Sequence, residues 1–411
     1  MPPSPSAPPL PKVKLAPRGA ERLKSGHVWV YRSDVADADG VAPGSVVTVT
    51  DSRGKALGTA LYSSSSQIAI RLLAPEHVAD FRGLLRQRIA DAVAYRERVV
   101  RDSSAYRVIF SEGDFLPGLI VDRYNDILTL QILVQAMDAD LVRETVMSEL
   151  TERLSPASIV ERVDARVREL ESLPARSSGL VQGEKTSTVF AMNGVQFIYD
   201  ATEGQKTGAF LDQRENYAAA AQYGHGEALD VFCYQGGFAL HLASRCTQVT
   251  GVDSSRPALE VAERNEALNR ETWVSRASDG TGVGKNEIEW IEANAFDLLK
   301  DYAAAKRQYD TIVLDPPAFA KTKRDLDAAM RGYNEINLRA LKMLRPGGIL
   351  VTCSCSYHVS QALFLEMLAS AAADAHRTVR VLEVRGQAKD HPVLLNVPET
   401  AYLKCVILFV N

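Results

Sequence analysis

Residues 228–238 of the chain read A-L-D-V-F-C-Y-Q-G-G-F. An apolar run that ends in two glycines is typical of a buried parallel strand followed by a tight turn into a helix. Glycine has no side chain, so such a turn lets the backbone approach a ligand closely. The same residues would also serve a simple strand-to-helix turn, and they lack the G-x-G-x-x-G spacing of dinucleotide enzymes. The neighbouring segments therefore decide what the turn is for.

Strand-like and helical runs alternate from Glu227 to the C-terminus. This alternation predicts an α/β fold with a Rossmann-like, doubly wound parallel sheet that has helices on both faces. In such a sheet the ligand lies at the carboxyl ends of the strands. The polar stretch Trp273–Lys285 is expected to be a flexible surface insertion. The predicted helices are Phe238–Arg245, Pro257–Leu268, Phe296–Lys306, Leu326–Leu344 and Gln361–Ala373.

The N-terminal half has a different pattern, which predicts three further segments before a C-terminal domain at 188–411. Residues 1–12 are rich in proline and predict a disordered tail. Short strands broken by glycine over residues 13–75 predict a small β-barrel whose local charge is positive. Residues 76–187 predict a connector helix, Asp80–Arg101, followed by a small α+β middle domain.

The composition excludes several classes of protein. A chain of 411 residues with 46% hydrophobic residues is long enough for two or three domains with real cores. No apolar run reaches the roughly 18 residues of a membrane span, and the N-terminus lacks the layout of a signal peptide, so we expect a cytoplasmic protein. The five cysteines form no C-x-x-C pair, which argues against a disulfide framework and a structural metal. A net charge of -4 still leaves room for a local basic face that binds nucleic acid.

Two polar residues follow the next predicted strands. Asp253 ends the second strand, where a carboxylate can accept hydrogen bonds from a ribose diol, and Asn294 follows the third strand, where an amide can contact an adenine edge. Together with the Gly236–Gly237 turn they predict an adenosine pocket without a pyrophosphate clamp. This favours S-adenosylmethionine over NAD, and an NAD-dependent oxidoreductase ranks last among the alternatives.

The fourth and fifth strands end in chemically reactive residues. The fourth ends in D-P-P, whose prolines stiffen the loop that presents Asp315, and the fifth ends in T-C-S-C-S. A cysteine thiolate can add to C6 of a pyrimidine and make C5 nucleophilic, while a carboxyl group can hold N3 and the exocyclic amine. Alternate residues of a strand face the same side, so Cys353 and Cys355 could both reach the pocket. Cys355 lies nearer the rim and is the predicted nucleophile; the other cysteines are expected to be small buried residues.

Six motifs together resemble one known family, the bacterial 23S ribosomal RNA cytosine-C5 methyltransferases with an N-terminal PUA domain. The similarity runs from about residue 13 to the C-terminus, and the string G-Q-K-T-G-x-F-x-D-Q-R is highly specific. The motifs are G-H-V-W-V-Y-R (26–32), E-G-D-F-L-P-G-L-I-V-D-R-Y (112–124), G-Q-K-T-G-A-F-L-D-Q-R-E-N (204–216), D-V-F-C-Y-Q-G-G-F (230–238), D-P-P-A-F-A-K (315–321) and S-C-S (354–356).

The resemblance implies a methyltransferase sheet, a PUA module that binds RNA, S-adenosylmethionine as cofactor, 23S ribosomal RNA as partner and a homodimer. It places the nucleophile on Cys355. By themselves the residues of 205–214 form a loop of mixed charge, in which Lys206 and Arg214 could hold a carboxylate or phosphate. The resemblance implies cofactor contacts at Lys206, Thr207, Phe210, Asp212, Asp230, Cys233, Gly236, Gly237, Asp253, Asn294 and Asp315.

Two departures from the family pattern and two alternative functions remain open. The C-S-C-S pair leaves the choice of cysteine open, and the insertion at Trp273–Lys285 could alter the substrate entrance. D-P-P-A-F is close to the D-P-P-aromatic signature of enzymes that methylate a purine amine, although Ala318 occupies the aromatic position. A catalytically inactive RNA-binding assembly factor is the other alternative.

In both the cytosine and the purine methyltransferase the target base must leave its stack to reach the site. Lys321, Lys323 and Arg324 are expected to help bind the RNA.

Overall fold

The N-terminal region is a six-stranded mixed sheet covered by one helix. The computed structural model describes residues 9–202, 209–278, 287–320 and 322–411. The strand order is β2-β6-β5-β4-β1-β3, and α1 (Pro17–Lys24) starts with proline, whose fixed φ suits the first helical position. Ala20 and Leu23 of α1 are buried with the inward side chains of the sheet. The strands are β1 (Lys12–Leu15), β2 (Trp29–Tyr31), β3 (Val35–Asp37), β4 (Val46–Thr50), β5 (Ala56–Tyr62) and β6 (Ile68–Ala74).

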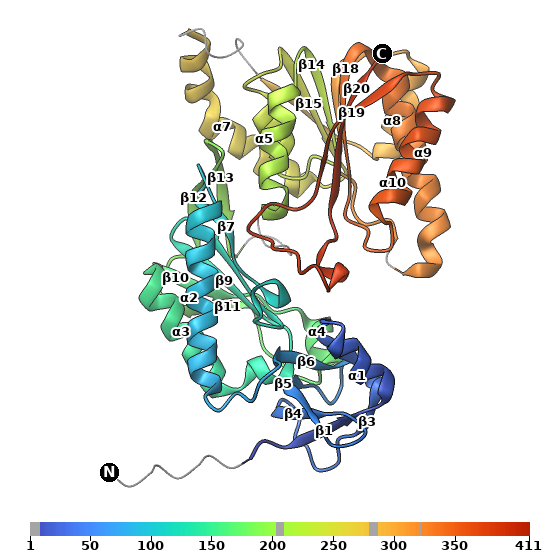
Figure 1. Cartoon of the computed structure of the whole chain (residues 1–411). Coiled ribbons are helices and arrows are strands. Elements are labelled where there is room, and N and C mark those ends of the chain that lie inside the picture. Colours follow the sequence, from blue (N-terminus) through green and yellow to red (C-terminus); the bar gives the residue numbers. More distant parts are fainter. Residues whose placement is uncertain (1–8, 203–208, 279–286, 321) are drawn as a thin grey trace.

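The middle region is a five-stranded sheet with two long helices packed together beside it (Figure 1). Asp80 caps the first helix by accepting a hydrogen bond from the backbone N–H of Gly83. The sheet order is β11-β10-β9-β8-β7. The helices are α2 (Phe81–Val99), α3 (Asp140–Leu154) and the short α4 (Ala165–Leu170), and the strands are β7 (Ala105–Phe110), β8 (Leu119–Tyr124), β9 (Ile127–Ile132), β10 (Ser158–Glu161) and β11 (Gly179–Gln182).

A hairpin joins the middle region to the C-terminal domain. It consists of β12 (Ser187–Met192) and β13 (Val195–Asp200), whereas the sequence predicted a single strand-like run over 188–199. The turn residues Asn193 and Gly194 have φ of 51° and 79°, the left-handed conformation that a two-residue hairpin turn requires. Aromatic side chains of the hairpin share one core with Tyr124 of β8 and with buried residues of the C-terminal domain. The hairpin therefore packs on both sides of the predicted domain boundary.

The C-terminal domain is the predicted doubly wound α/β fold. The sheet order is β16-β15-β14-β17-β18-β20-β19, with parallel pairing from β16 to β18. The sheet is mixed rather than fully parallel, because β20 runs antiparallel to both neighbours. The strands are β14 (Glu227–Val231), β15 (Gln248–Asp253), β16 (Ile288–Glu292), β17 (Tyr309–Leu314), β18 (Leu344–Ser354), β19 (Val379–Arg385) and β20 (Lys404–Val410).

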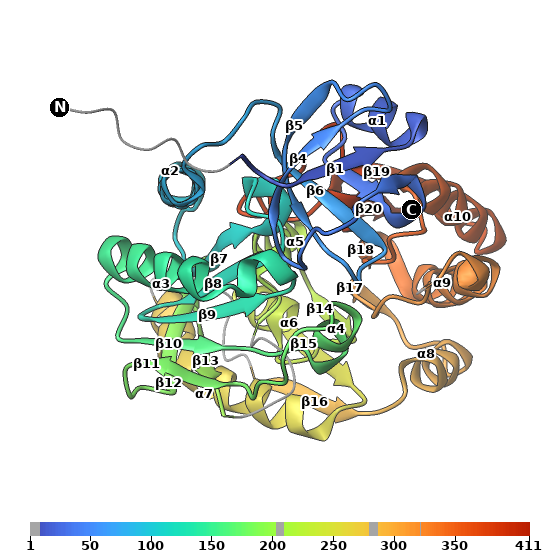
Figure 2. The ribbon, with the colours of Figure 1, turned by 90° about the horizontal axis from the view of Figure 1, so that it is seen from below.

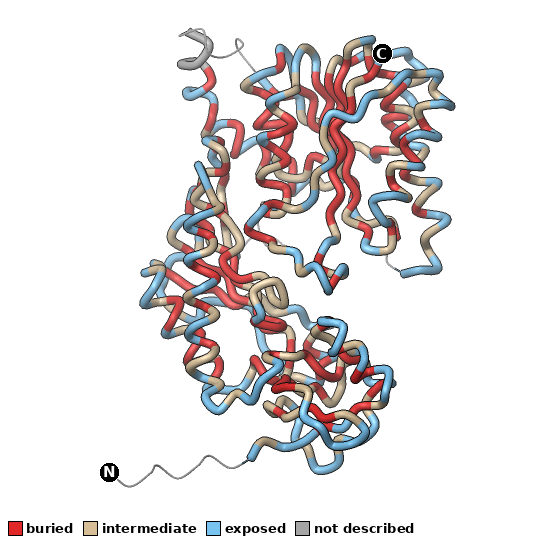
Figure 3. Tube along the Cα trace, viewed as in Figure 1, coloured by how far each residue is buried: buried red, intermediate tan, exposed pale blue. Residues whose placement is uncertain are grey.

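Helices cover both faces of this sheet and bury two separate cores. Figure 3 colours the buried residues of the chain red. One face is covered by α5 and α6 and the other by α8, α9 and α10 (Figure 1). Helix α7 runs to Ser278, so the start of the predicted insertion at 273–285 is helical, and residues 279–286 lie outside the described residues. The helices are α5 (Arg214–Tyr223), α6 (Gly237–Leu242), α7 (Arg256–Ser278), α8 (Ala295–Ala304), α9 (Leu326–Met343) and α10 (Gln361–Asp374).

The strand order reverses beside β14, because the chain steps from β14 to β15 on one side and later adds β17 on the other. Doubly wound sheets bind ligands at such a switch point, outside the carboxyl ends of the strands. In Figure 1 this edge faces the N-terminal and middle regions, and in Figure 2, seen from below, those two regions lie in front of the C-terminal domain. Among the described helices, none has the length and hydropathy needed to cross a membrane.

Candidate active site

A pocket of about 1060 Å³ opens at the carboxyl edge of the C-terminal sheet. Its walls come from the ends of β14, β15 and β17, from the loop after β18 and from the segment before α5. Apolar side chains such as Phe232 and Val261 alternate with a few polar ones, as is usual for a cofactor site. The predicted site residues that line it are Phe210, Asp212, Asp253, Asp315 and Cys355.

The turn after β14 has a strained backbone. Phe232 and Tyr234 have φ of 69° and 50°, and Gly236 has φ of 86°. A non-glycine residue in the left-handed region costs on the order of 1–3 kcal/mol and persists only where surrounding contacts hold it. The side chains of Phe232 and Tyr234 both line the pocket, and the centre of the Tyr234 ring lies 5.1 Å from that of the Phe210 ring. The strain is therefore located where the turn forms the pocket wall.

The glycines of this turn are required by packing inside the protein. A Cβ atom at Gly236 would lie 2.7 Å from the Trp290 ring, and one at Gly237 would lie 2.5 Å from the Tyr217 ring. Gly237 and Cys233 line a small second pocket beside the large one, whereas Gly236 lines neither. The sequence analysis attributed these glycines to the close approach of a ligand. The close approach of the Trp290 and Tyr217 rings is already a sufficient reason for them.

Asp253 is held rigidly at the end of β15. Its Oδ2 accepts a hydrogen bond from the backbone N–H of Tyr234 at 2.9 Å, and its Oδ1 accepts one from Ser255 at 2.9 Å. The carboxylate therefore links the β14 turn to the start of α7 while it lines the pocket. Each carboxylate oxygen has a further lone pair, so a ligand hydroxyl can still donate to it.

Two other predicted residues do not line either pocket. Asp230 is fully buried in β14, and its Oδ2 accepts a hydrogen bond from the backbone N–H of Ala239 at 2.8 Å, so it anchors α6 beneath the turn. Asn294 is exposed and caps α8, where its Oδ1 accepts from the backbone N–H groups of Phe296 and Asp297. The cap is by itself a sufficient reason for an Asn after β16.

Two carboxyl groups from different segments line the same part of the pocket. Asp315 follows β17, and its Oδ1 accepts a hydrogen bond from the Gln213 side chain at 2.9 Å. Asp212 accepts a hydrogen bond from the Tyr402 hydroxyl at 2.6 Å. Burial, and then the charge of Asp212, raises the pKa of Asp315 to about 7. A carboxyl group with this pKa can donate as well as accept a proton near neutral pH.

The structure separates the two cysteines of C-S-C-S. Cys353 lies inside β18, is fully buried in the core and is paired across the sheet with Cys405. Cys355 lies beyond the end of β18, where it lines the pocket and its Sγ is 3.8 Å from the Pro316 carbonyl oxygen. The expectation that both could reach the pocket is wrong for Cys353, because its side chain is packed in the core between the sheet and helices α5 and α6. Burial, followed by the charges of Asp315 and Asp212, raises the pKa of the Cys355 thiol to about 11.

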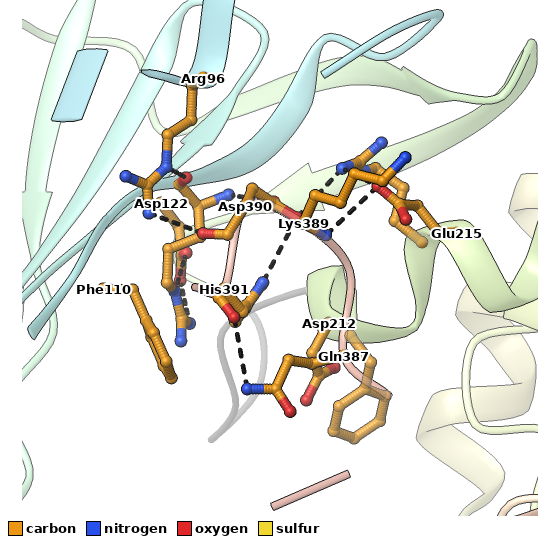
Figure 4. A network of polar contacts seen from close by, with 12 residues as sticks. Arg96, Phe110, Asp122, Asp212, Glu215, Gln387, Lys389, Asp390 and His391 are labelled. Carbon is orange, nitrogen blue, oxygen red and sulfur yellow. Dashed lines mark hydrogen bonds and ion pairs between the residues drawn. The ribbon is translucent and has the colours of Figure 1, made fainter. Parts of the chain in front are cut away.

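The connection between β19 and β20, residues 386–403, ties the pocket to the other two regions. Asp390 of this connection is fully buried between three arginines, and Figure 4 shows it beside Arg96 of α2. Its carboxylate accepts from the backbone N–H of Arg107 at 2.8 Å and from the Arg214 side chain at 3.0 Å, and its carbonyl accepts from Arg96 at 2.7 Å. Arg214 was predicted as a ligand for a carboxylate or phosphate, but its partner is this internal carboxylate.

The same connection reaches the N-terminal region and returns to the pocket. Glu399 lies 3.4 Å from the Arg22 side chain and 3.2 Å from that of His27. Tyr402 then holds Asp212, and Leu403 lines the pocket. One segment therefore contacts all three regions of the chain.

Replacing Asp390 with asparagine should destabilise the fold by about 3 kcal/mol, because Arg214, only 2% exposed, would lose its nearer and fully buried charge partner and, among the described residues, keep only Glu215 at 3.5 Å. Burial alone would raise the pKa of Asp390, but His391 and Arg214 lower it below its ordinary value. A carboxyl group whose pKa is lowered by folding stabilises the fold at pH values above about 4. The stability difference between wild type and Asp390→Asn should therefore have its full size at pH 7 and vanish in strong acid.

Urea unfolding at pH 7 measures this loss. The control is Arg256→Ala, which removes an exposed ion pair with Glu263 and should cost under about 1 kcal/mol. Equal midpoints for Asp390→Asn and the control would contradict the role assigned to Asp390.

Several pocket residues were missed from the sequence, and two predicted ones cannot be placed. Gln213 and Leu403, which line the pocket, were not predicted, nor was Tyr402, which holds Asp212. The sequence Y-L-K at the start of an apolar strand was the only local signal for Tyr402 and Leu403. Lys206 and Thr207 lie outside the described residues, as does Lys321. In the described part of the chain, no cluster of three or more His, Cys, Asp or Glu side chains is placed to hold a metal ion.

Comparisons with known proteins agree with this architecture. A model of the PUA-like domain matches residues 13–75, and a model of the S-adenosylmethionine-dependent methyltransferases matches residues 155–408. A methyltransferase complexed with SAH and a second methyltransferase, from Streptococcus mutans, have the same fold. Their TM-scores are 0.77 at 18% and 17% identity, and the matches cover 97% of this chain and 99% of each of those chains.

Curated relatives match over almost the whole chain. Ribosomal RNA large subunit methyltransferase I of Shewanella amazonensis is 37% identical over 405 residues, which cover 96% of this chain and 98% of the relative. The protein of the same name from Yersinia pseudotuberculosis is 37% identical over 397 residues, with 94% and 96% covered. The chain therefore belongs to the family of S-adenosylmethionine-dependent methyltransferases with an N-terminal PUA-like domain that includes the large subunit ribosomal RNA methyltransferases I.

Proposed function

We propose that this enzyme methylates C5 of a cytosine in 23S ribosomal RNA, with Cys355 as nucleophile and Asp315 as the acid that holds the base. One observation carries the proposal: a cysteine and a carboxyl group from two neighbouring strands line the same pocket. The relatives are named for ribosomal RNA of the large subunit. The PUA-like region at residues 13–75 would then bind the RNA outside the pocket.

The pocket fits S-adenosylmethionine by its shape and by its polar groups. Asp253 is fixed where it can accept hydrogen bonds from the ribose hydroxyls, and apolar side chains such as Pro257 and Val261 line the same cavity. Phe210 and Asp212 line the same pocket and would contact the rest of the cofactor, with Lys206 and Thr207 in the segment just before them in the sequence. When bound, the cofactor supplies an electrophilic methyl group on a sulfonium.

Asp230, Cys233, Gly236, Gly237 and Asn294 would act less directly. The first four shape and anchor the turn that faces the cofactor, because Asp230 holds α6 and the two glycines admit aromatic rings. Asn294 uses its Oδ1 to cap α8, which leaves its side-chain N–H₂ group for an adenine edge.

The proposed reaction begins at the Cys355 sulfur. The thiolate forms a bond to C6 of the cytosine, and the electron pair of the C5–C6 double bond shifts toward C4 and N3, which makes C5 nucleophilic. C5 then takes the methyl group, so the carbon–sulfur bond of the donor breaks and a thioether leaves. A base removes the proton from C5, the C5–C6 double bond re-forms as the Cys355–C6 bond breaks to release the sulfur, and N3 returns to Asp315 the proton it received during the attack.

Asp315 would control the charge that develops on the ring. Attack at C6 makes N3 more basic, and a protonated carboxyl group beside N3 can donate its proton there. The pKa of about 7 keeps a large fraction of Asp315 protonated at neutral pH. The Gln213 side chain fixes Oδ1 as an acceptor, which leaves Oδ2 to carry the proton.

Mapping of methylated nucleotides tests the proposal in cells. We expect 23S ribosomal RNA from cells without this gene to lack one 5-methylcytosine that returns when the wild-type gene is restored. The Cys355→Ser gene should not restore it. Loss of a methylated purine amine instead would favour the alternative enzyme, and an unchanged map of the ribosomal RNA would contradict the proposed substrate.

Replacing Asp253 with alanine should weaken binding of S-adenosylmethionine by about 10–100-fold. A hydrogen bond to a charged group contributes about 1.5–3 kcal/mol, and each 1.4 kcal/mol is a factor of ten. Titration calorimetry measures the affinity. The control is Asp301→Asn, an exposed acid on α8, which should bind as wild type does. Unchanged affinity of Asp253→Ala would remove Asp253 from the cofactor site.

A further inference from the structure

A lysine is buried beside the loop that carries Cys355. Lys404 begins β20, whose other residues are apolar, and only 6% of its surface is exposed. Burial of an ammonium group costs several kcal/mol unless a partner compensates for the lost water. Such a residue in an otherwise apolar strand therefore calls for an explanation.

The ammonium group is held against the loop that carries Cys355. Its Nζ donates to the carbonyl oxygen of Ser356 at 2.6 Å and to that of Tyr402 at 2.9 Å. Lys404 also lies opposite Ser354 in the pairing of β18 with β20. In the described part of the chain no carboxylate lies within ion-pair distance of Nζ. The two neutral carbonyl groups fix the position of the Lys404 ammonium without neutralising its charge.

Among the described residues, four titratable groups from different elements lie around Cys355, and one of them, the Lys404 ammonium, carries a charge that favours the thiolate. Asp315 after β17 and Asp212 before α5 both raise the thiol pKa, whereas Lys404 of β20 lowers it. Tyr333 of α9 is the fourth group, and its own ionisation is disfavoured by Cys355. The Lys404 ammonium is thus the cation that offsets two nearby carboxyl groups.

We propose that Lys404 is the charge partner of Cys355: its ammonium, fixed by the carbonyls of Ser356 and Tyr402, stabilises the thiolate that attacks the base. The thiol proton leaves to solvent as the thiolate forms. Lys404 acts through Cys355 and is not itself a catalytic residue. The inference rests on the proposed function of Cys355, but the ionisation of this thiol can be measured without any methyl transfer.

The test is the pH dependence of alkylation at Cys355. Iodoacetamide reacts with the thiolate only, so its rate at this peptide, followed by mass spectrometry between pH 7 and 10.5, is proportional to the thiolate fraction and shows how the thiol pKa differs between variants. Wild type, Lys404→Met and Lys404→Arg are compared as full chains, and Cys355→Ser assigns the labelled peptide. Thermal unfolding establishes that each variant is folded before labelling.

We expect Lys404→Met to react about tenfold more slowly than wild type near pH 7.5, which corresponds to a rise of about one unit in the thiol pKa. Lys404→Arg keeps the positive charge and should restore most of the rate. Burial lowers the pKa of Lys404 to about 8, so the difference between wild type and Lys404→Met should shrink as the pH rises past that value. A purely structural role would give a difference that does not depend on pH.

Identical pH profiles for wild type and Lys404→Met would overturn the inference, as would a Lys404→Arg variant that reacts as slowly as Lys404→Met. These outcomes are distinct from failure of the proposed function. If Cys355→Ser kept full methyl transfer, the cysteine mechanism would fail while the comparison of alkylation rates would still stand.

Discussion

Replacing Cys355 with serine should lower methyl transfer to RNA by at least about a thousandfold and leave binding of S-adenosylmethionine unchanged. The serine hydroxyl ionises far less readily than a thiol and is a much weaker nucleophile toward a pyrimidine ring. Loss of a nucleophile removes the step on which the later ones depend, so other residues cannot compensate. Single-turnover transfer of a labelled methyl group measures the rate, and calorimetry with the cofactor measures binding.

Cys353→Ala is the matched control for this experiment. Cys353 is fully buried in the core of β18, so the substitution should cost stability on the order of 1 kcal/mol and keep turnover within about tenfold of wild type. If Cys353→Ala were inactive and Cys355→Ser active, the assignment of the nucleophile would be reversed. If both were fully active, a reaction without a cysteine, such as methylation of a purine amine, would be favoured.

Replacing Asp315 with asparagine should slow methyl transfer by about 100–10,000-fold, because an amide cannot deliver a proton to N3. The variant should still bind the cofactor, since the Asp315 side chain is assigned to the base. Asp301→Asn on the exposed face of α8 is the control and should transfer methyl groups at the wild-type rate. An Asp315→Asn variant with wild-type turnover would remove the carboxyl group from the mechanism.

The pH profile gives a sharper form of this prediction. The thiolate fraction of Cys355 grows tenfold per pH unit below its pKa of about 11, whereas the protonated fraction of Asp315 falls above about 7. In wild type the two slopes cancel above pH 7, so the logarithm of kcat/KM should rise to about pH 7 and then level off. In Asp315→Asn the rise should continue beyond pH 7. A plateau in the variant at the same pH would assign the titration to another group.

The fold of the C-terminal domain could be predicted because its local patterns agree with its tertiary structure. Apolar strands alternate with amphipathic helices, and each strand has helices or strands on both sides. The hairpin at β12–β13 was missed although Asn193–Gly194 is a strong turn signal, because a continuous β-like composition masked it. Helix α5 was missed because it begins with polar residues, and some of those, Arg214 and Asn216, are in fact buried.

The site could be predicted only where its residues follow strands. Asp253, Asp315 and Cys355 each come after an apolar run, so topology alone brings them to one edge of the sheet. Tyr402 and Lys404 reach the same place through the β19–β20 connection, whose path depends on Asp390 and Glu399 and on arginines from distant parts of the chain. No local pattern encodes such long-range ion pairs. Sequence alone did not show the second role of Asn294 and the glycines, because a helix cap and tight packing use the same residue types as ligand contacts.

The most direct test of the cysteine mechanism is to trap the adduct with RNA that carries 5-fluorocytidine at the target position. Fluorine at C5 cannot leave as a proton does, so the bond between the enzyme sulfur and C6 should persist after methyl transfer. We predict one covalent complex per enzyme in the presence of S-adenosylmethionine, with the RNA attached to the peptide that contains Cys355 and no complex with Cys355→Ser. Wild-type enzyme that methylates the unmodified RNA but never becomes linked to the fluorinated RNA would contradict the account.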